Sequence, residues 1–478
     1  LFLYIMSVVR HNKKSSKVQV RFGCTLPKPK YGKVEVHRTK FKNGIKMAAT
    51  KVNQDTRLAA VTIMYQAGSR MESGRALGAT HFIRAATCAE EYIESHYYRY
   101  LQEHGGIILC NADRQSIAFT LCCPSPLYKH FKGIFIDVAC RLMHSFDIAM
   151  VLKDLHHMRP DQLAMDLVQQ AVWAGPLGNS VYCPAGRVEG MSEAALLEYA
   201  GEAFTTDRCS VASIGIPCEE TCKLVEEIEG DVSQPLCPRG AVETRDLGAG
   251  VETWLAVGVP SCGITYDCGP GPHREVFAYA LLAAAMGQGN VLTGSHHYNC
   301  LRQISPANTH RADVCTLYKA FNICYRETGT FGFLVRTKAD KADCAANFLM
   351  NFLEYLTLVQ PDHIRMAKYR LKVELAKHAE DCVKQCEGLA LEIAYGHAMD
   401  NVGAAFAVID AISDDMVFSA ARALATKSES AATKFHPLFD PSLGTALARW
   451  QQSNRIRCCW RYGSNSRVWY CVAEIIDT

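Results

Sequence analysis

The sequence predicts an α+β fold of two similar domains, each an antiparallel-rich β-sheet with helices packed on one face. Two observations predict this class. The chain has 478 residues, of which 49% are hydrophobic, as expected for a globular protein with sizeable cores. The same succession of strand, turn, helix, strand and amphipathic helix also occurs twice along it.

The first copy spans residues 34–218. It opens with an apolar strand, passes through a polar, glycine-bearing turn into a helix, and then alternates further strands and helices. The expected strands are 58–66, 115–122 and 211–216, and the expected helices begin near residues 79, 127 and 161. A last helix begins after Ser192, because a serine followed by an acidic first turn is typical of a helix N-terminus.

The second copy spans residues 241–440 and follows the same order. The expected strands are 251–259, 321–336 and a short terminal strand at 431–435, and the expected helices are 274–286, 338–358 and 362–396. Ser413, followed by two aspartates, predicts the start of its last helix. Two copies of one α+β unit explain this pattern better than one large domain does.

Three segments lie outside the copies. Residues 1–33 are basic and hydroxylated without an acid, as in a mitochondrial transit peptide, although a basic arm that stays on the protein is the alternative. Residues 219–240 are acidic and contain proline, which predicts a linker. Residues 441–478 hold three tryptophans and five arginines, which predicts an extension that docks on a neighbour or folds back onto its own domain.

The composition excludes several functions. Residues 1–34 contain eight Lys or Arg, so the rest of the chain holds 43 basic against 48 acidic residues, and no nucleic-acid surface is expected. The longest apolar run, residues 276–286, is shorter than the roughly 20 residues that span a bilayer, so membrane association would come only through partners. None of the 22 cysteines stands in C-x-x-C spacing, which argues for scattered thiols.

The most informative stretch is residues 68–85, which reads Gly-Ser-Arg-Met-Glu, then Gly-Ala-Thr-His, then Phe-Ile-Arg-Ala. On a helix, His81, Arg84 and Ala85 share one face. A zinc peptidase of the inverted type needs His at the first and third of these positions and Glu at the second as proton acceptor. A guanidinium cannot be deprotonated near neutral pH, so these are the degenerate positions of a catalytic site.

This stretch resembles the pitrilysin and mitochondrial processing peptidase family, whose signature is a Gly-Ser-Arg-x-Glu turn followed by H-x-x-E-H. Within it the chain is most similar to second core proteins of mitochondrial ubiquinol–cytochrome c reductase (complex III), which also carry H-x-x-R. The family's third zinc ligand is a Glu some seventy residues downstream, yet no Glu occurs between Glu103 and Glu189. Residues 179–184 and 325–333 also match the family.

The resemblance implies an inactive peptidase homologue without metal or cofactor, a structural subunit on the matrix face of the mitochondrial inner membrane. Its partners would be the first core protein, which has the same fold, and the other subunits of the dimeric respiratory complex, including the cytochromes and the iron-sulfur protein.

Two alternatives remain open. One is a non-catalytic α-type subunit of a processing peptidase, whose long glycine-rich loop is reduced here to a short turn at residues 285–290, where Gly287 also suits a helix end with positive φ. The other is an autonomous metallopeptidase, which would hold zinc with one ligand of three.

Overall fold

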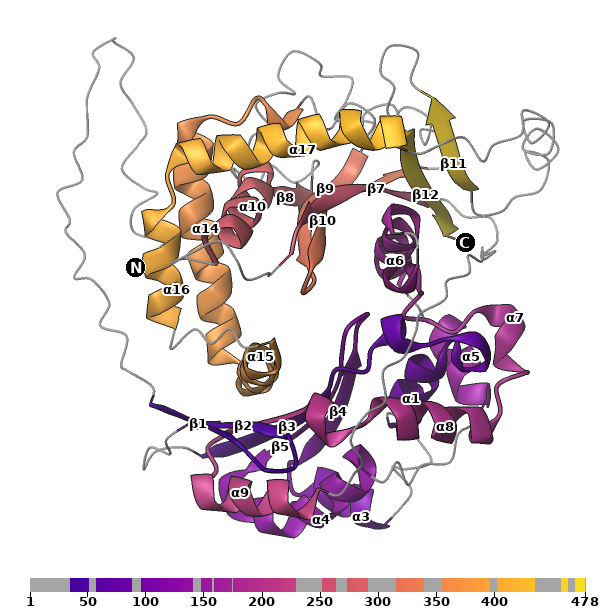
Figure 1. Ribbon diagram of the computed structural model, residues 1–478, viewed down its shortest axis with the longest axis vertical. Helices are drawn as coiled ribbons and strands as arrows, with labels where there is room; N and C mark the ends of the chain where they lie inside the picture. The colour runs from indigo at the N-terminus through magenta and orange to yellow at the C-terminus, as the bar shows by residue number, and fades with distance from the viewer. Residues whose placement is uncertain are drawn as a thin grey trace, which may run out of the picture. The chain divides into compact units, whose positions relative to one another are not determined.

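Two six-stranded β-sheets organise a computed structural model of the chain (Figure 1). The structure describes residues 35–50, 57–87, 96–140, 148–156, 159–173, 175–228, 252–263, 273–290, 315–338, 355–395, 402–434, 457–462 and 469–477. The mixed helices and strands, and one sheet for each sequence copy, confirm the predicted α+β class.

The first sheet has the strand order β1-β2-β6-β3-β5-β4. Its strands are β1 (Val36–Lys40), β2 (Lys46–Thr50), β3 (Leu58–Tyr65), β4 (Ile107–Ala112), β5 (Ile117–Pro124) and β6 (Cys209–Ile214). All neighbours run antiparallel except β2 and β6, which are parallel. The central strand β3 is buried after its first residue, because both faces of the sheet are covered.

The first half of the chain contributes one set of helices. They are α1 (Ala79–Thr87), α3 (His96–Glu103), α4 (Tyr128–Ala139), α5 (Ile148–His156), α6 (Pro160–Val172), α7 (Ala185–Val188), α8 (Glu193–Ala203) and α9 (Cys218–Glu227). Of these, α6 packs on the second sheet. Short 3-10 turns lie at Ser69–Met71, Gly74–Ala76, Ser125–Leu127, Pro176–Gly178 and Thr206–Arg208. The Ser192 side chain accepts a hydrogen bond from the backbone N–H of Ala195 at 3.2 Å, so the predicted cap of α8 is confirmed.

The second sheet has the strand order β11-β12-β7-β10-β9-β8 and is antiparallel throughout. Its strands are β7 (Glu252–Cys262), β8 (Gln288–Asn290), β9 (Cys315–Cys324), β10 (Thr328–Lys338), β11 (Arg457–Tyr462) and β12 (Trp469–Asp477). The helices of this half are α10 (His273–Met286), α14 (Pro361–Glu380), α15 (Cys382–Tyr395), α16 (Val402–Ala411) and α17 (Asp414–Lys434). Tyr279, Phe331 and Phe333 are fully buried in its core.

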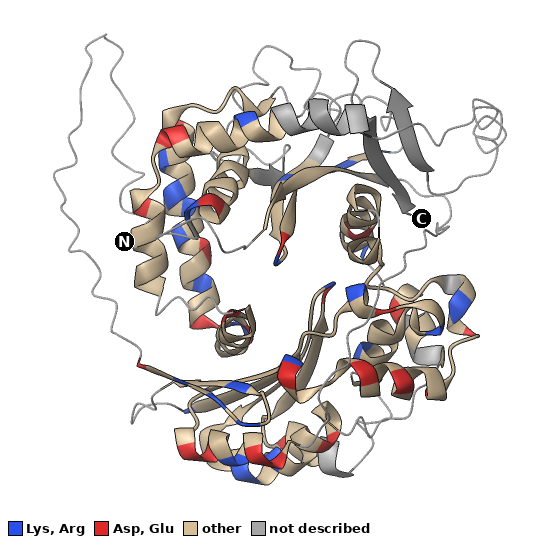
Figure 2. Cartoon of the chain, in the orientation of Figure 1, with Lys and Arg blue, Asp and Glu red and all other residues tan. Residues whose placement is uncertain are grey.

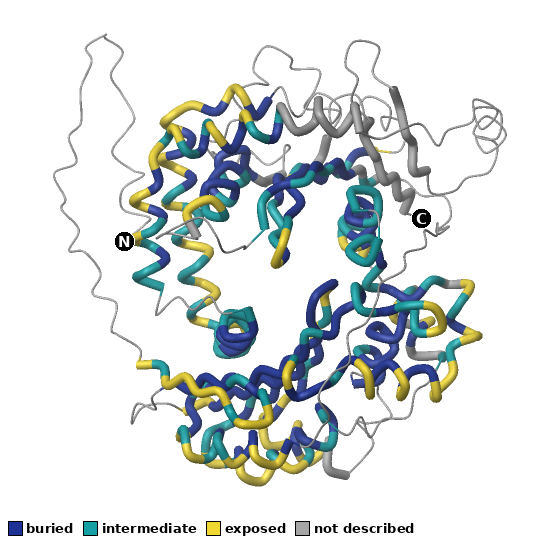
Figure 3. Tube along the Cα trace, viewed as in Figure 1, coloured by how far each residue is buried: buried dark blue, intermediate teal, exposed yellow. Residues whose placement is uncertain are grey.

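Each half lends one helix to the sheet of the other half (Figure 1). Helix α6 packs Leu163, Leu167 and Val168 against the second sheet. Helix α15 packs Cys386, Leu389, Ala390, Ile393 and Ala394 against the first sheet. The sequence predicted helices on one face of each sheet, and this exchange adds a helix on the opposite face. The inner strands β3 and β10 are therefore buried along most of their lengths (Figure 3).

Some expected boundaries differ from the structure. Residues 219–227 of the expected linker belong to α9, and its Leu224 and Val225 are fully buried in the first core. The strand expected at 431–435 was wrong, because α17 continues to Lys434 through residues that favour a helix. The helix expected at 362–396 is two helices, since Asp381 accepts backbone hydrogen bonds from Val383 and Lys384 and starts α15.

Two expected segments fall outside the described residues, and part of the C-terminal extension falls within them. Residues 1–33 and most of the helix expected at 338–358 lie outside the described residues. In the extension 441–478, β12 pairs antiparallel with β7, so its backbone continues the chain's own second sheet. This favours the second of the two alternatives stated for that extension.

The helices of the second half differ in charge. Helix α14 carries Lys and Arg as well as Asp and Glu, whereas α10 carries few charges (Figure 2). Among the described residues, no helix has both the length and the apolar character needed to cross a bilayer.

Candidate functional site

The motif at residues 68–72 forms a turn that caps helix α1. The buried carboxylate of Glu72 accepts hydrogen bonds from the backbone N–H groups of Gly78 and Thr80, each at 2.7 Å. These donors are the groups that a helix N-terminus leaves without partners, and a carboxylate there is favoured by the helix dipole. Burial outweighs these hydrogen bonds and raises the pKa of Glu72 to about 7.

Gly78 brings a second segment close to this cap. Its φ is +98°, and a Cβ atom there would lie 2.5 Å from Cys183 Sγ. Glycine alone therefore meets both the backbone conformation and the close approach. The loop that contains Cys183 is thus pressed against the start of α1.

His81 is buried, with both ring nitrogens engaged. The backbone N–H of Cys183 donates to Nδ1 at 3.0 Å, and Nε2 lies 2.7 Å from Oδ2 of Asp154 on α5. Because Nδ1 accepts a hydrogen bond, Nε2 is the nitrogen that carries the proton and donates to Asp154. The edge of the His81 ring also meets the Tyr182 ring, with 5.5 Å between centroids.

Arg84 shares the same carboxylate oxygen. Its Nη2 donates to Asp154 Oδ2 at 2.9 Å, and its guanidinium carbon lies 5.2 Å from the centroid of the Tyr182 ring. The hydrogen bond from His81, followed by the charge of Arg84, holds the pKa of Asp154 below its usual value. Ala85, one residue further along α1, is buried in the first core.

Asp154 is the site residue that the sequence analysis missed. It lies 73 residues after His81, in the interval where the resemblance placed a glutamate ligand. Only glutamate was sought there, so an aspartate at the expected spacing was overlooked. The sequence carried this signal, but the contact itself depends on how α5 packs beside α1.

The residues present do not fit a zinc ion of the inverted peptidase type. Such a site takes two imidazoles and one carboxylate, with an open position for water. Here Ala85 supplies no donor atom, and the guanidinium of Arg84 takes the Asp154 oxygen that would face a metal. A permanent cation thus balances the carboxylate. Within the described ranges, no three His, Cys, Asp or Glu side chains are grouped to hold a metal.

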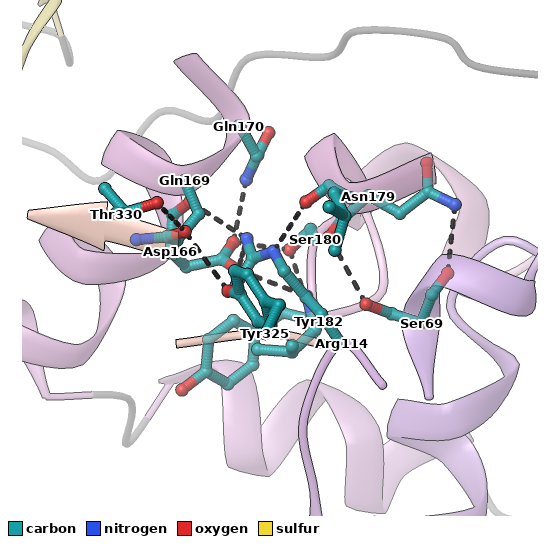
Figure 4. A network of polar contacts seen from close by, with 12 residues as sticks. Ser69, Arg114, Asp166, Gln169, Gln170, Asn179, Ser180, Tyr182, Tyr325 and Thr330 are labelled. Atoms are coloured by element: carbon teal, nitrogen blue, oxygen red, sulfur yellow. Dashed lines mark hydrogen bonds and ion pairs between the residues drawn. The ribbon is translucent and has the colours of Figure 1, made fainter. Parts of the chain in front are cut away.

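The motifs at residues 68–72 and 179–184 are in contact at this site. The Asn179 side chain donates to the backbone oxygens of Ser69 at 2.9 Å and Glu72 at 3.0 Å, which ties the loop at residues 179–184 to the turn before α1. The Ser180 hydroxyl donates to Asp166 Oδ2 at 2.6 Å (Figure 4). These segments act together as structural supports for the buried histidine.

Asp166 anchors a buried network at the crossing helix α6. Arg114 Nη2 lies 2.6 Å from Asp166 Oδ1, and both side chains are almost wholly buried. On the same helix, Gln169 Oε1 accepts hydrogen bonds from the hydroxyls of Tyr325 at 3.1 Å and Thr330 at 2.8 Å (Figure 4). The second-half motif at residues 325–333 therefore contacts the first half directly.

A surface ion pair joins the capping turn to the second half. Arg70 Nη1 lies 3.0 Å from Oε2 of Glu327, a residue in the turn between β9 and β10.

The glycine turn of the second half ends α10. Gly287 has a φ of +91° there, which confirms the prediction of a glycine helix stop.

Comparisons with known proteins point to one peptidase family. The family described as "Insulinase (Peptidase family M16)" matches residues 47–185, and that described as "Peptidase M16 inactive domain" matches residues 190–370. The chain is similar to the probable mitochondrial-processing peptidase subunit alpha of Schizosaccharomyces pombe, at 23% identity over 75% of each chain.

It is also similar to the human cytochrome b-c1 complex subunit 2, at 22% identity over 64% of this chain and 68% of the human one. A solved structure titled "Complex III2 from Candida albicans, Inz-5 bound" contains a chain of the same fold. That match has a TM-score of 0.64 and 15% identity, and it covers 81% of this chain and 93% of the other.

Proposed function

Since this chain belongs to peptidase family M16, with matches in both of its halves, we propose that it is a non-catalytic core subunit of mitochondrial complex III. The observation that carries the proposal is the Arg84–Asp154 ion pair at the position of the peptidase base. His81, Arg84 and Ala85 are then structural residues, and the chain holds no zinc. The homology to a human complex III subunit supports the assignment to this complex.

In this role the chain is a peripheral subunit on the matrix side of the inner membrane. It pairs with a first core protein of the same fold, in a dimeric complex whose cytochromes and iron-sulfur protein carry out electron transfer. Its crossing helices α6 and α15 pack on the sheets, so contacts with such partners would be made by the outer helices and the loops.

The test is to isolate the native protein in mild detergent, measure the mass of its assembly and identify the chains that accompany it. We expect an assembly of several hundred kilodaltons that contains cytochromes and a second chain of this family. Recovery of the protein alone, with stoichiometric zinc and peptide-cleaving activity, would refute the proposal.

A second candidate is the α-type subunit of a mitochondrial processing peptidase, supported by the similarity to alpha subunits of that enzyme. The short turn at Gly287 weighs against it, since α10 passes through this single residue directly into β8. A native assembly of only two family members that cleaves presequences would favour this candidate. If substitutions at Gly287 and Gly289 abolish cleavage, this turn takes part in it.

A further inference from the structure

Helix α15 is held on the first sheet by polar contacts as well as by packing. Lys46 Nζ and Gln66 Nε2 both donate to the backbone oxygen of Ala394, at 2.8 and 3.1 Å, near the end of the helix. The Ser210 hydroxyl donates to Ala390 O at 3.1 Å. The helix of one half therefore depends on several groups of the other half for its position.

At the start of the same helix, two cysteines from different halves meet. Cys122 lies on β5, opposite Ala60 of β3, and Cys386 of α15 lies over that position, with its sulfur 3.6 Å from Ala60 O. Cys382 is one helical turn before Cys386, so it faces the sheet beside Cys122. Cys382 packs against the apolar cluster on this face of the sheet, close enough to Cys122 for the two thiols to interact.

The pair is placed for reaction, because both thiols are partly exposed and one is activated. The interaction with Cys382 lowers the pKa of Cys122, which favours its thiolate form. The thiolate is the nucleophilic form of cysteine, and redox-sensitive cysteines are typically accessible and close to a resolving thiol. Cys382 is in the position of that resolving thiol.

We propose that Cys122 and Cys382 are a redox pair that a hydroperoxide converts to a reversible disulfide, which fastens α15 to the first sheet. The Cys122 thiolate attacks the terminal oxygen of the hydroperoxide, the O–O bond breaks, and a sulfenic acid forms while an alkoxide leaves, or hydroxide when the oxidant is hydrogen peroxide. The Cys382 sulfur then attacks the Cys122 sulfur, the S–O bond breaks, and water leaves with the Cys382 proton. The two thiols lose two electrons, which the peroxide accepts, and a dithiol reductant reverses the change by exchange.

The consequence is a covalent tie between the halves of the chain. Such a tie reduces the freedom of the unfolded chain most when it closes a long loop, as it does between residues 122 and 382. It would also prevent α15 from separating from β3 and β5. The oxidised protein is therefore expected to unfold at a higher temperature than the reduced protein.

The test uses the full chain, reduced and then exposed to graded hydrogen peroxide. Free thiols are alkylated, and peptides are mapped by mass spectrometry. We expect a peptide pair joined through Cys122 and Cys382, lost on reduction and in Cys122→Ser and Cys382→Ser. The rise in unfolding temperature on oxidation is expected to disappear in the same two variants.

Cys123→Ala is the matched control. Cys123 is the next residue of β5 but faces the first core, where it is almost wholly buried, and burial raises the pKa of its thiol to about 12. Its substitution should leave the linked peptide unchanged. If a variant fails to fold, the wild-type peptide map decides, because other partly exposed thiols, such as those of Cys218 and Cys222, report that the oxidant has reacted. Oxidation of those thiols while Cys122 and Cys382 stay free would overturn the proposal.

Discussion

Arg84 Nη2 lies 2.9 Å from Oδ2 of Asp154, the oxygen that His81 also contacts. Asp154 follows His81 at the spacing at which the family's third ligand was expected, and Arg84 occupies the position of the peptidase base. A cation of the chain itself therefore balances the carboxylate. The Asp154 carboxylate is therefore paired with a cation even though the site lacks the second imidazole of a zinc peptidase.

Replacement of Asp154 with Asn should lower the free energy of unfolding by about 1 kcal/mol at neutral pH, a small value because the carboxylate is half exposed. Its folded pKa is lowered, so the stabilisation is present above the unfolded value of about 3.9 and is lost as the pH falls through the folded pKa. Urea unfolding at several pH values measures this. Asp161→Asn, at an exposed pair with Arg159, is the control and should change little.

Arg84→Glu combined with Ala85→His should rebuild a zinc site with His81 and Asp154. Positions i, i+3 and i+4 share a helix face, so both new side chains lie on the face of α1 that carries His81. We expect one equivalent of zinc per chain and an unfolding temperature that rises with zinc concentration. Arg84→Glu alone lacks the second imidazole and should not bind zinc stoichiometrically. Equal zinc uptake by the unaltered chain would contradict this account of the site.

Gly78→Ala should destabilise the fold more than Gly74→Ala does. Both glycines have positive φ, at +98° and +54°, but a Cβ at Gly78 would lie 2.5 Å from Cys183 Sγ, whereas one at Gly74 would meet nothing within 4 Å. The backbone conformation alone costs about 1 kcal/mol or more, and the clash adds to it at Gly78. Thermal unfolding of the two variants measures the difference. Equal effects would show that the approach of Cys183 to α1 is unimportant.

Arg114→Met should lower the free energy of unfolding by about 3–5 kcal/mol, because it leaves the buried carboxylate of Asp166 without its cation. Arg159→Met removes an exposed pair instead and should cost less than about 1 kcal/mol. Denaturant unfolding compares the two. A small effect at Arg114 would mean that Ser180 and Gln170, which also donate to Asp166, satisfy the carboxylate by themselves.

The local patterns were sufficient for most elements near the site. The apolar run that begins at residue 58 predicts β3, and the serine before an acidic turn predicts α8, because both signals depend on neighbours in sequence. The end of α17 was misjudged, since its last residues favour a helix and no breaker stands before Lys434. Asp154 was missed because only one type of carboxylate was sought.

By itself, the sequence determined that two related α+β units follow one another and that the zinc motif is interrupted at Arg84 and Ala85, because periodicity and residue chemistry are local properties. Only the tertiary structure decided that Asp154 receives Arg84 and His81, and that α6 and α15 each cover the sheet of the other half. The physical reason is that an apolar helix face specifies only that it must be buried. Which surface buries it depends on the shape and polar groups of segments hundreds of residues away.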